Sequence, residues 1–126
     1  MLSEVSPISF PEPTGLNINM MPFVMGNIGS LPDFARQYAD LIEKCFLTPG
    51  EIVYLTVNES WIEAGKCQRR PGVHTDATAH HGWGKGSWGG SSSGKGIYLC
   101  SSDGACRAWD VMVAESEVDA HGAMLP

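Results

Sequence analysis

Residues 51–59, EIVYLTVNE, mark the place where the period of this chain changes to two. The stretch is β-branched and aromatic, which is typical of a β-strand. The residues before it, 31–46, instead repeat their apolar positions at three- and four-residue steps, as an amphipathic helix does. A covering helix followed by strands predicts an α+β fold, mainly β, with antiparallel sheets.

The expected helix has recognisable ends. Ser30 can cap its first turn, Pro32 is tolerated there, and Asp33 stands at the capping-box spacing. Thr48-Pro49-Gly50 ends it. The residues predicted to face the sheet are Leu31, Phe34, Tyr38, Leu41, Ile42, Cys45 and Phe46.

Further strands are expected before the helix at 31–46 and after the strand at 51–59. LNINMMPFVMG (16–26) predicts a half-buried strand that ends before Pro22, with Leu16, Ile18 and Met20 on one face. GIYLCSS and CRAWDVMV predict two strands joined by a hairpin at Asp103-Gly104. We therefore expect an extended N-terminal arm over 1–15 and a single domain with a barrel or sandwich core over 16–126.

Charge and composition exclude several classes of function. The net charge of −6 argues against nucleic acid as a partner. No stretch approaches the roughly 18 apolar residues that span a membrane. The N-terminus has an early acid and several prolines, which is untypical of a secretory signal. The four cysteines are scattered without a CxxC pair, so we expect reduced thiols, a Cys100–Cys106 disulfide being the less favoured alternative, and a cytoplasmic location.

The candidate metal ligands are His74 and Asp76, in the stretch PGVHTD. Positions i and i+2 of a strand project to the same face, so an imidazole and a carboxylate there can hold one divalent metal ion. A third ligand from another strand would complete a facial triad of two histidines and one carboxylate. The simpler interpretation is a surface histidine beside a turn-forming aspartate.

The other histidines offer alternatives. His80 or His81 could join His74 and Asp76 in a local zinc cluster, as a cupin-like isomerase or a metal hydrolase would need, although the spacing matches no known zinc motif. His121 stands at a distance compatible with a distal ligand, but DAHGAML lacks a strand pattern. A solvent-exposed His121 is therefore the preferred interpretation.

The glycine-rich stretch after these ligands carries the candidate binding residues. Trp83 and Trp88 could stack on a substrate, or fold back to anchor the loop. Lys85 and Lys95 could hold an acidic co-substrate, or be solvated loop residues. The carboxylate pairs Glu59 with Glu63 and Glu115 with Glu117 are interpreted as solvated faces.

Two blocks, YLTVNESWIEAGKCQRRPGVHTD and GIYLCSSDGACRAWDVMV, resemble a family of largely uncharacterised proteins. That family shows a YLT-x-x-E strand, an RRPG-x-H-T-[ED] turn, a glycine- and tryptophan-rich loop, and two later strands. The resemblance covers roughly residues 16–118, and RRPGVHTD is its most specific part. It implies a jelly-roll (double-stranded β-helix, cupin-like) fold similar to that of iron and 2-oxoglutarate dioxygenases.

By this resemblance, His74 and Asp76 would bind Fe(II), and Lys85 or Lys95 would anchor 2-oxoglutarate. The reaction would be hydroxylation of a small-molecule or protein substrate. The family pattern also implies a later histidine and a basic residue, so an incomplete jelly roll is expected. The alternative is a non-catalytic jelly-roll module for binding or assembly, which would pair as a homodimer or with a complementing chain.

Overall fold

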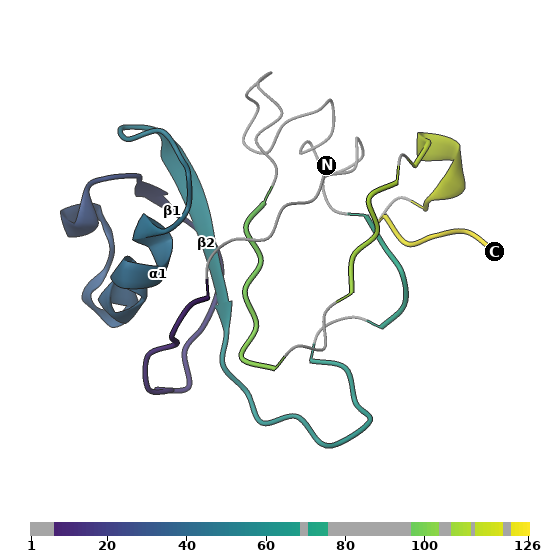
Figure 1. Cartoon of the computed structure of the whole chain (residues 1–126), viewed down its shortest axis with the longest axis horizontal. Helices are drawn as coiled ribbons and strands as arrows, with labels where there is room; N and C mark the ends of the chain where they lie inside the picture. Colours follow the sequence, from purple (N-terminus) through teal and green to yellow (C-terminus); the bar gives the residue numbers. More distant parts are fainter. Residues whose placement is uncertain (1–6, 69–70, 76–96, 104–106, 112, 120–121) are drawn as a thin grey trace. The chain divides into compact units, whose positions relative to one another are not determined.

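A computed structural model describes residues 7–68, 71–75, 97–103, 107–111, 113–119 and 122–126 (Figure 1). The chain divides into two compact units. We call Glu4–Lys66 the first unit, and Cys67–Pro126 together with Met1–Ser3 the second unit. The first holds a two-stranded antiparallel sheet with short helices, so the described fold is a small α+β fold, low in helix. The finer jelly-roll arrangement and the division at residue 15 stay predictions.

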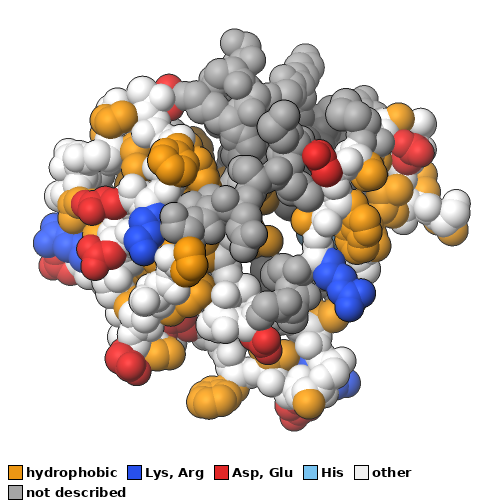
Figure 2. All heavy atoms as spheres, in the orientation of Figure 1, with side chains coloured by type: hydrophobic (Ala, Val, Ile, Leu, Met, Phe, Trp, Pro, Cys, Tyr) orange, Lys and Arg blue, Asp and Glu red, His pale blue; other side chains and the backbone are white. Residues whose placement is uncertain are grey.

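Hydrophobic side chains lie on the surface among acidic and basic ones, as Figure 2 shows for one face. Large apolar side chains are exposed in both units; examples are Phe34, Phe46 and Ile52 in the first and Leu99, Trp109 and Val111 in the second. Within the described residues, no helix has the length and apolarity needed to cross a membrane.

The sheet pairs β1 (Asn17–Val24) with β2 (Ile52–Asn58) in antiparallel register. The expected strand at 51–59 is therefore confirmed. The prediction that the first strand ends before Pro22 is wrong, because β1 continues to Val24 and is an edge strand of the sheet that the described residues form. Met25 donates its N–H to Glu51 and accepts one from Gly50, so by alternation Pro22 points its missing N–H away from β2.

A bulge changes which residues of β1 face the core. The register shifts between Ile18 and Met21, and Met20 adopts a left-handed conformation with a φ of 52°. After the bulge, Met21 pairs with Leu55 and Phe23 pairs with Val53. The expectation that Met20 continues the face of Leu16 and Ile18 is therefore wrong.

The expected single α-helix over 31–46 is two shorter pieces, and a separate 3₁₀ turn precedes them. The 3₁₀ helices η1 (Ile28–Ser30) and η2 (Asp33–Tyr38) precede a short α1 (Ala39–Glu43). Ser30 is not a helix cap: its hydroxyl donates to Asn27 and accepts the N–H of Val24, which joins η1 to the end of β1. η2 follows Pro32, which makes no side-chain cap.

The 3₁₀ conformation explains which helical residues are buried. With three residues per turn, Ala35 and Tyr38 lie on one face of η2 and Phe34 is turned outward, 55% exposed. Phe46, beyond α1, is 85% exposed. The predicted core positions Leu31, Tyr38 and Ile42 are confirmed, whereas Phe34 and Phe46 are wrong and Ala35 was missed.

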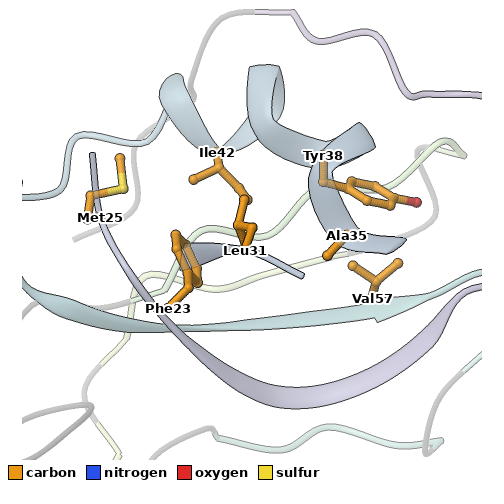
Figure 3. Close-up of a cluster of buried hydrophobic side chains, with 7 residues drawn as sticks. All are labelled: Phe23, Met25, Leu31, Ala35, Tyr38, Ile42 and Val57. Carbon is orange, nitrogen blue, oxygen red and sulfur yellow. The ribbon is translucent and has the colours of Figure 1, made fainter. Parts of the chain in front are cut away.

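The core lies between the helical pieces and one face of the sheet (Figure 3). Leu31 is its most buried large side chain, at 1% exposure. The buried set is Phe23, Met25, Leu31, Ala35, Tyr38, Ile42 and Val57. All seven belong to the first unit, so burial of apolar surface stabilises this unit.

The second unit contains the 3₁₀ helix η5 (Glu115–Glu117) and isolated β-bridges. The described residues of the predicted hairpin, 97–103 and 107–111, form no regular strand. A β-strand needs a neighbouring strand to pair with, and these described residues make no such pairing. Gly104, the second residue of the predicted turn, lies outside the described residues.

Candidate functional site

The segment that carries His74 pairs with the C-terminal end of the chain. His74 and Ala123 form an antiparallel bridge. On either side of it, the N–H of Thr75 donates to the carbonyl of Gly122 at 2.7 Å, and the N–H of Met124 donates to that of Val73 at 3.1 Å. Residues 73–75 and 122–124 therefore lie side by side although about fifty positions separate them in the sequence.

On the side away from His74, the C-terminal segment 122–125 is hydrogen-bonded to Glu117 and Asp119. Asp119 donates its N–H to the carbonyl of Ala123, and its carboxylate Oδ1 accepts the N–H of Ala123 at 3.0 Å. The carbonyl of Asp119 accepts the N–H of Gly122, and Leu125 donates to Glu117. Residues 122–125 are thus the middle of three short antiparallel segments.

The His74 side chain is exposed, and its ring has one nearby backbone acceptor. Nδ1 lies 3.3 Å from the carbonyl oxygen of Gly72. When Nδ1 carries the ring proton, this contact is a hydrogen bond and the lone pair of Nε2 is available to a metal ion.

The other predicted site residues lie outside the described residues: Asp76, His80, His81, Trp83, Lys85, Trp88, Lys95 and His121. Among the residues that are described, no three histidine, cysteine or acidic side chains gather as a metal site would require. His74 is the one predicted ligand that the structure locates. The metal and co-substrate assignments therefore stay predictions.

Sequence reasoning missed a second cluster, around Glu59. Its Oε2 accepts three successive backbone N–H groups, from Thr14 at 2.6 Å, Gly15 at 2.8 Å and Leu16 at 3.1 Å. Its Oε1 accepts the hydroxyl of Tyr38 at 2.6 Å. The interpretation of Glu59 as a solvated carboxylate is wrong: it ties the end of β2 to residues 14–16 and to η2.

The electrostatics of this cluster favour a charged Glu59. The hydrogen bond from Tyr38 lowers the pKa of Glu59 most; partial burial opposes it, and the three backbone N–H groups add to the lowering. Burial, together with the neighbouring carboxylate, raises the pKa of Tyr38. A neutral phenol beside a carboxylate is a structural pair, because neither group titrates near neutral pH.

None of the three described cysteines is in a disulfide. Cys45, Cys67 and Cys100 are thiols, and Cys106 lies outside the described residues.

Searches for similar proteins returned no matching family model, no curated relative and no solved structure.

Proposed function

We propose that this chain is an oxygenase of the Fe(II) and 2-oxoglutarate type, with His74, Asp76 and His121 as the metal ligands on a jelly-roll-like scaffold. The observation that carries the proposal is the pairing of residues 73–75 with residues 122–124. It supports His121, the residue before Gly122, as the candidate third ligand.

Covalent connectivity links this pairing to the two ligands that lie outside the described residues. Thr75 and Gly122 are joined by a backbone hydrogen bond of 2.7 Å. Asp76 follows Thr75, and His121 precedes Gly122. Each is therefore one Cα step, about 3.8 Å, from a residue of the bonded pair. This adjacency in sequence to the bonded pair is the reason for proposing His121 as a ligand in place of a solvent-exposed residue.

The donor set suits the metal. Two imidazoles and one carboxylate form the facial triad of non-haem iron proteins. The contact of His74 Nδ1 with the backbone carbonyl of Gly72 is the kind of second interaction that fixes the tautomer of a metal-bound histidine. The exposed His74 ring is also accessible to an entering ion.

The remaining roles come from the resemblance. Lys85 or Lys95 would hold the distal carboxylate of 2-oxoglutarate, and Trp83 with Trp88 would line the substrate pocket. When bound, Fe(II) and 2-oxoglutarate supply the activation of dioxygen for C–H hydroxylation.

Fe(II) binding by the wild type and by variants of its histidines tests the proposal. Anaerobic calorimetry with Fe(II) should show one site in the wild type, and His74→Ala or His121→Ala should abolish measurable uptake because each removes one of three ligands. The matched control is the double variant His80→Ala/His81→Ala, which should retain the site. Wild-type protein that binds no Fe(II), or undiminished binding by His121→Ala, would contradict the proposal.

A second titration separates an oxygenase from a metal protein of another kind. 2-Oxoglutarate should bind the Fe(II)-loaded protein, and either Lys85→Ala or Lys95→Ala should weaken that binding while leaving Fe(II) affinity unchanged. Loss of metal in His80→Ala/His81→Ala would instead favour the local zinc cluster.

A further inference from the structure

We infer that Asp119 is a positioning residue for the His74 ligand segment, acting through Ala123 and its neighbours without touching the metal. The metal part of this inference rests on the proposed function, whereas the positioning itself rests on described contacts. Asp119 binds both backbone groups of Ala123, and Ala123 is the residue that faces His74.

The alternation of backbone groups determines which side of residues 122–124 faces the His74 segment. In an extended segment, successive residues turn their N–H and C=O groups to opposite sides. The N–H and C=O of Ala123 point to Asp119. The C=O of Gly122 and the N–H of Met124 are thereby left to face Thr75 and Val73. Asp119 thus sets which side of residues 122–124 meets the His74 segment.

The carboxylate contributes a bond that the backbone of the turn does not make. The N–H of Ala123 is satisfied by Asp119 Oδ1, a side-chain acceptor four residues earlier. Without that acceptor, the part-buried N–H group of Ala123 would be more stable facing water. Residues 122–124 would then hold the His74 segment less firmly.

Amide hydrogen exchange on the metal-free protein tests the positioning role. Asp119→Ala should speed exchange at Thr75 and Met124, whose N–H groups make the two flanking bonds, by about 10-fold. Asp119→Asn keeps an Oδ1 acceptor and should exchange like the wild type. Asp103→Ala, an exposed aspartate of the same unit, is the matched control and should change neither amide.

Co(II) binding then supplies a readout that a general loss of stability would not reproduce. Asp119→Ala should weaken Co(II) binding by about 10-fold and alter the visible absorption spectrum of the bound ion, and Asp119→Asn should restore both. Unchanged exchange at Thr75 in Asp119→Ala would overturn the inference, as would an Asp119→Asn variant as impaired as Asp119→Ala. A wild type that binds no Co(II) would remove the proposed function, and the exchange result would still decide the positioning role.

Discussion

The two units of this chain are stabilised by different interactions. The first buries seven apolar residues between a two-stranded sheet and short helices. In the described part of the second, Gly122 is the one buried residue, and the segments there are held by backbone hydrogen bonds and by the turn at Asp119. The predicted ligands therefore belong to the unit whose described residues are less buried, so the local stability of that unit should respond to single hydrogen bonds.

The largest expected difference in unfolding free energy is between the same leucine-to-alanine substitution made once in each unit. Leu31→Ala should cost about 2–5 kcal/mol of the free energy of unfolding, because Leu31 is 1% exposed and leaves a cavity. Leu99→Ala should cost less than about 0.5 kcal/mol, because Leu99 is 64% exposed. Urea denaturation of both variants measures the two values, and equal losses would remove the contrast.

The next largest effect concerns Glu59, the main polar cluster of the first unit. Glu59→Ala should destabilise the protein by about 2 kcal/mol, since it leaves three backbone N–H groups and the Tyr38 hydroxyl without their acceptor. The exposed Glu63 is the control, and Glu63→Ala should change the unfolding free energy by less than about 0.5 kcal/mol.

The same carboxylate predicts an acid dependence. The native pKa of Glu59 lies below its unfolded value of 4.5, so its contribution is fully present above pH 4.5. It is lost as the pH falls from there through the native pKa. Glu59→Gln should lack this component when the unfolding free energy is measured between pH 7 and pH 2.5. An identical acid profile for wild type and variant would contradict the lowered pKa.

Two glycines give an intermediate effect in both units. Gly15 and Gly122 each have a φ of 80°, a conformation that costs an alanine about 1–2 kcal/mol. Gly15→Ala should lower the urea midpoint of the first unit, because relief of the unfavourable φ would displace the backbone N–H that residue 15 donates to Glu59. Gly122→Ala should act locally and speed amide exchange at Thr75. A matching global loss in Gly122→Ala would show that the two units unfold together.

The smallest expected effect is that of a surface ion pair. Asp33 lies 2.8 Å from Arg36, and both side chains are largely exposed. Asp33→Asn should therefore change the unfolding free energy by less than about 0.5 kcal/mol, and the change should shrink at high salt. A larger effect, measured by urea denaturation at two salt concentrations, would mean that this pair helps to order η2.

What could be predicted from the sequence follows the range of the interactions. β2 and the buried positions Leu31, Tyr38 and Ile42 are visible in local periodicity. The 3₁₀ conformation of η2 is not visible there, because the predicted apolar positions are compatible with an α-helix and with a 3₁₀ helix. The burial of Ala35 in the core distinguishes the two. The bulge at Met20 likewise depends on the partner strand, which local pattern does not contain.

The site was less accessible to sequence reasoning, because its contacts join distant positions. Glu59 meets residues 14–16 across more than forty positions, and no local motif marks that pairing. The stretch around His121 was set aside for its lack of alternation, yet residues 122–124 beside it pair with the His74 segment. A single bridge of three residues is too short to leave a periodic signal.

The edge of β1 has a consequence for association between copies of the chain. Pro22 presents no N–H on the outer side of β1, and the bulge at Met20 interrupts the row of backbone groups there. An incoming strand would meet a gap in the ladder at both places. We therefore expect β1 to be a poor template for the addition of a strand along this edge.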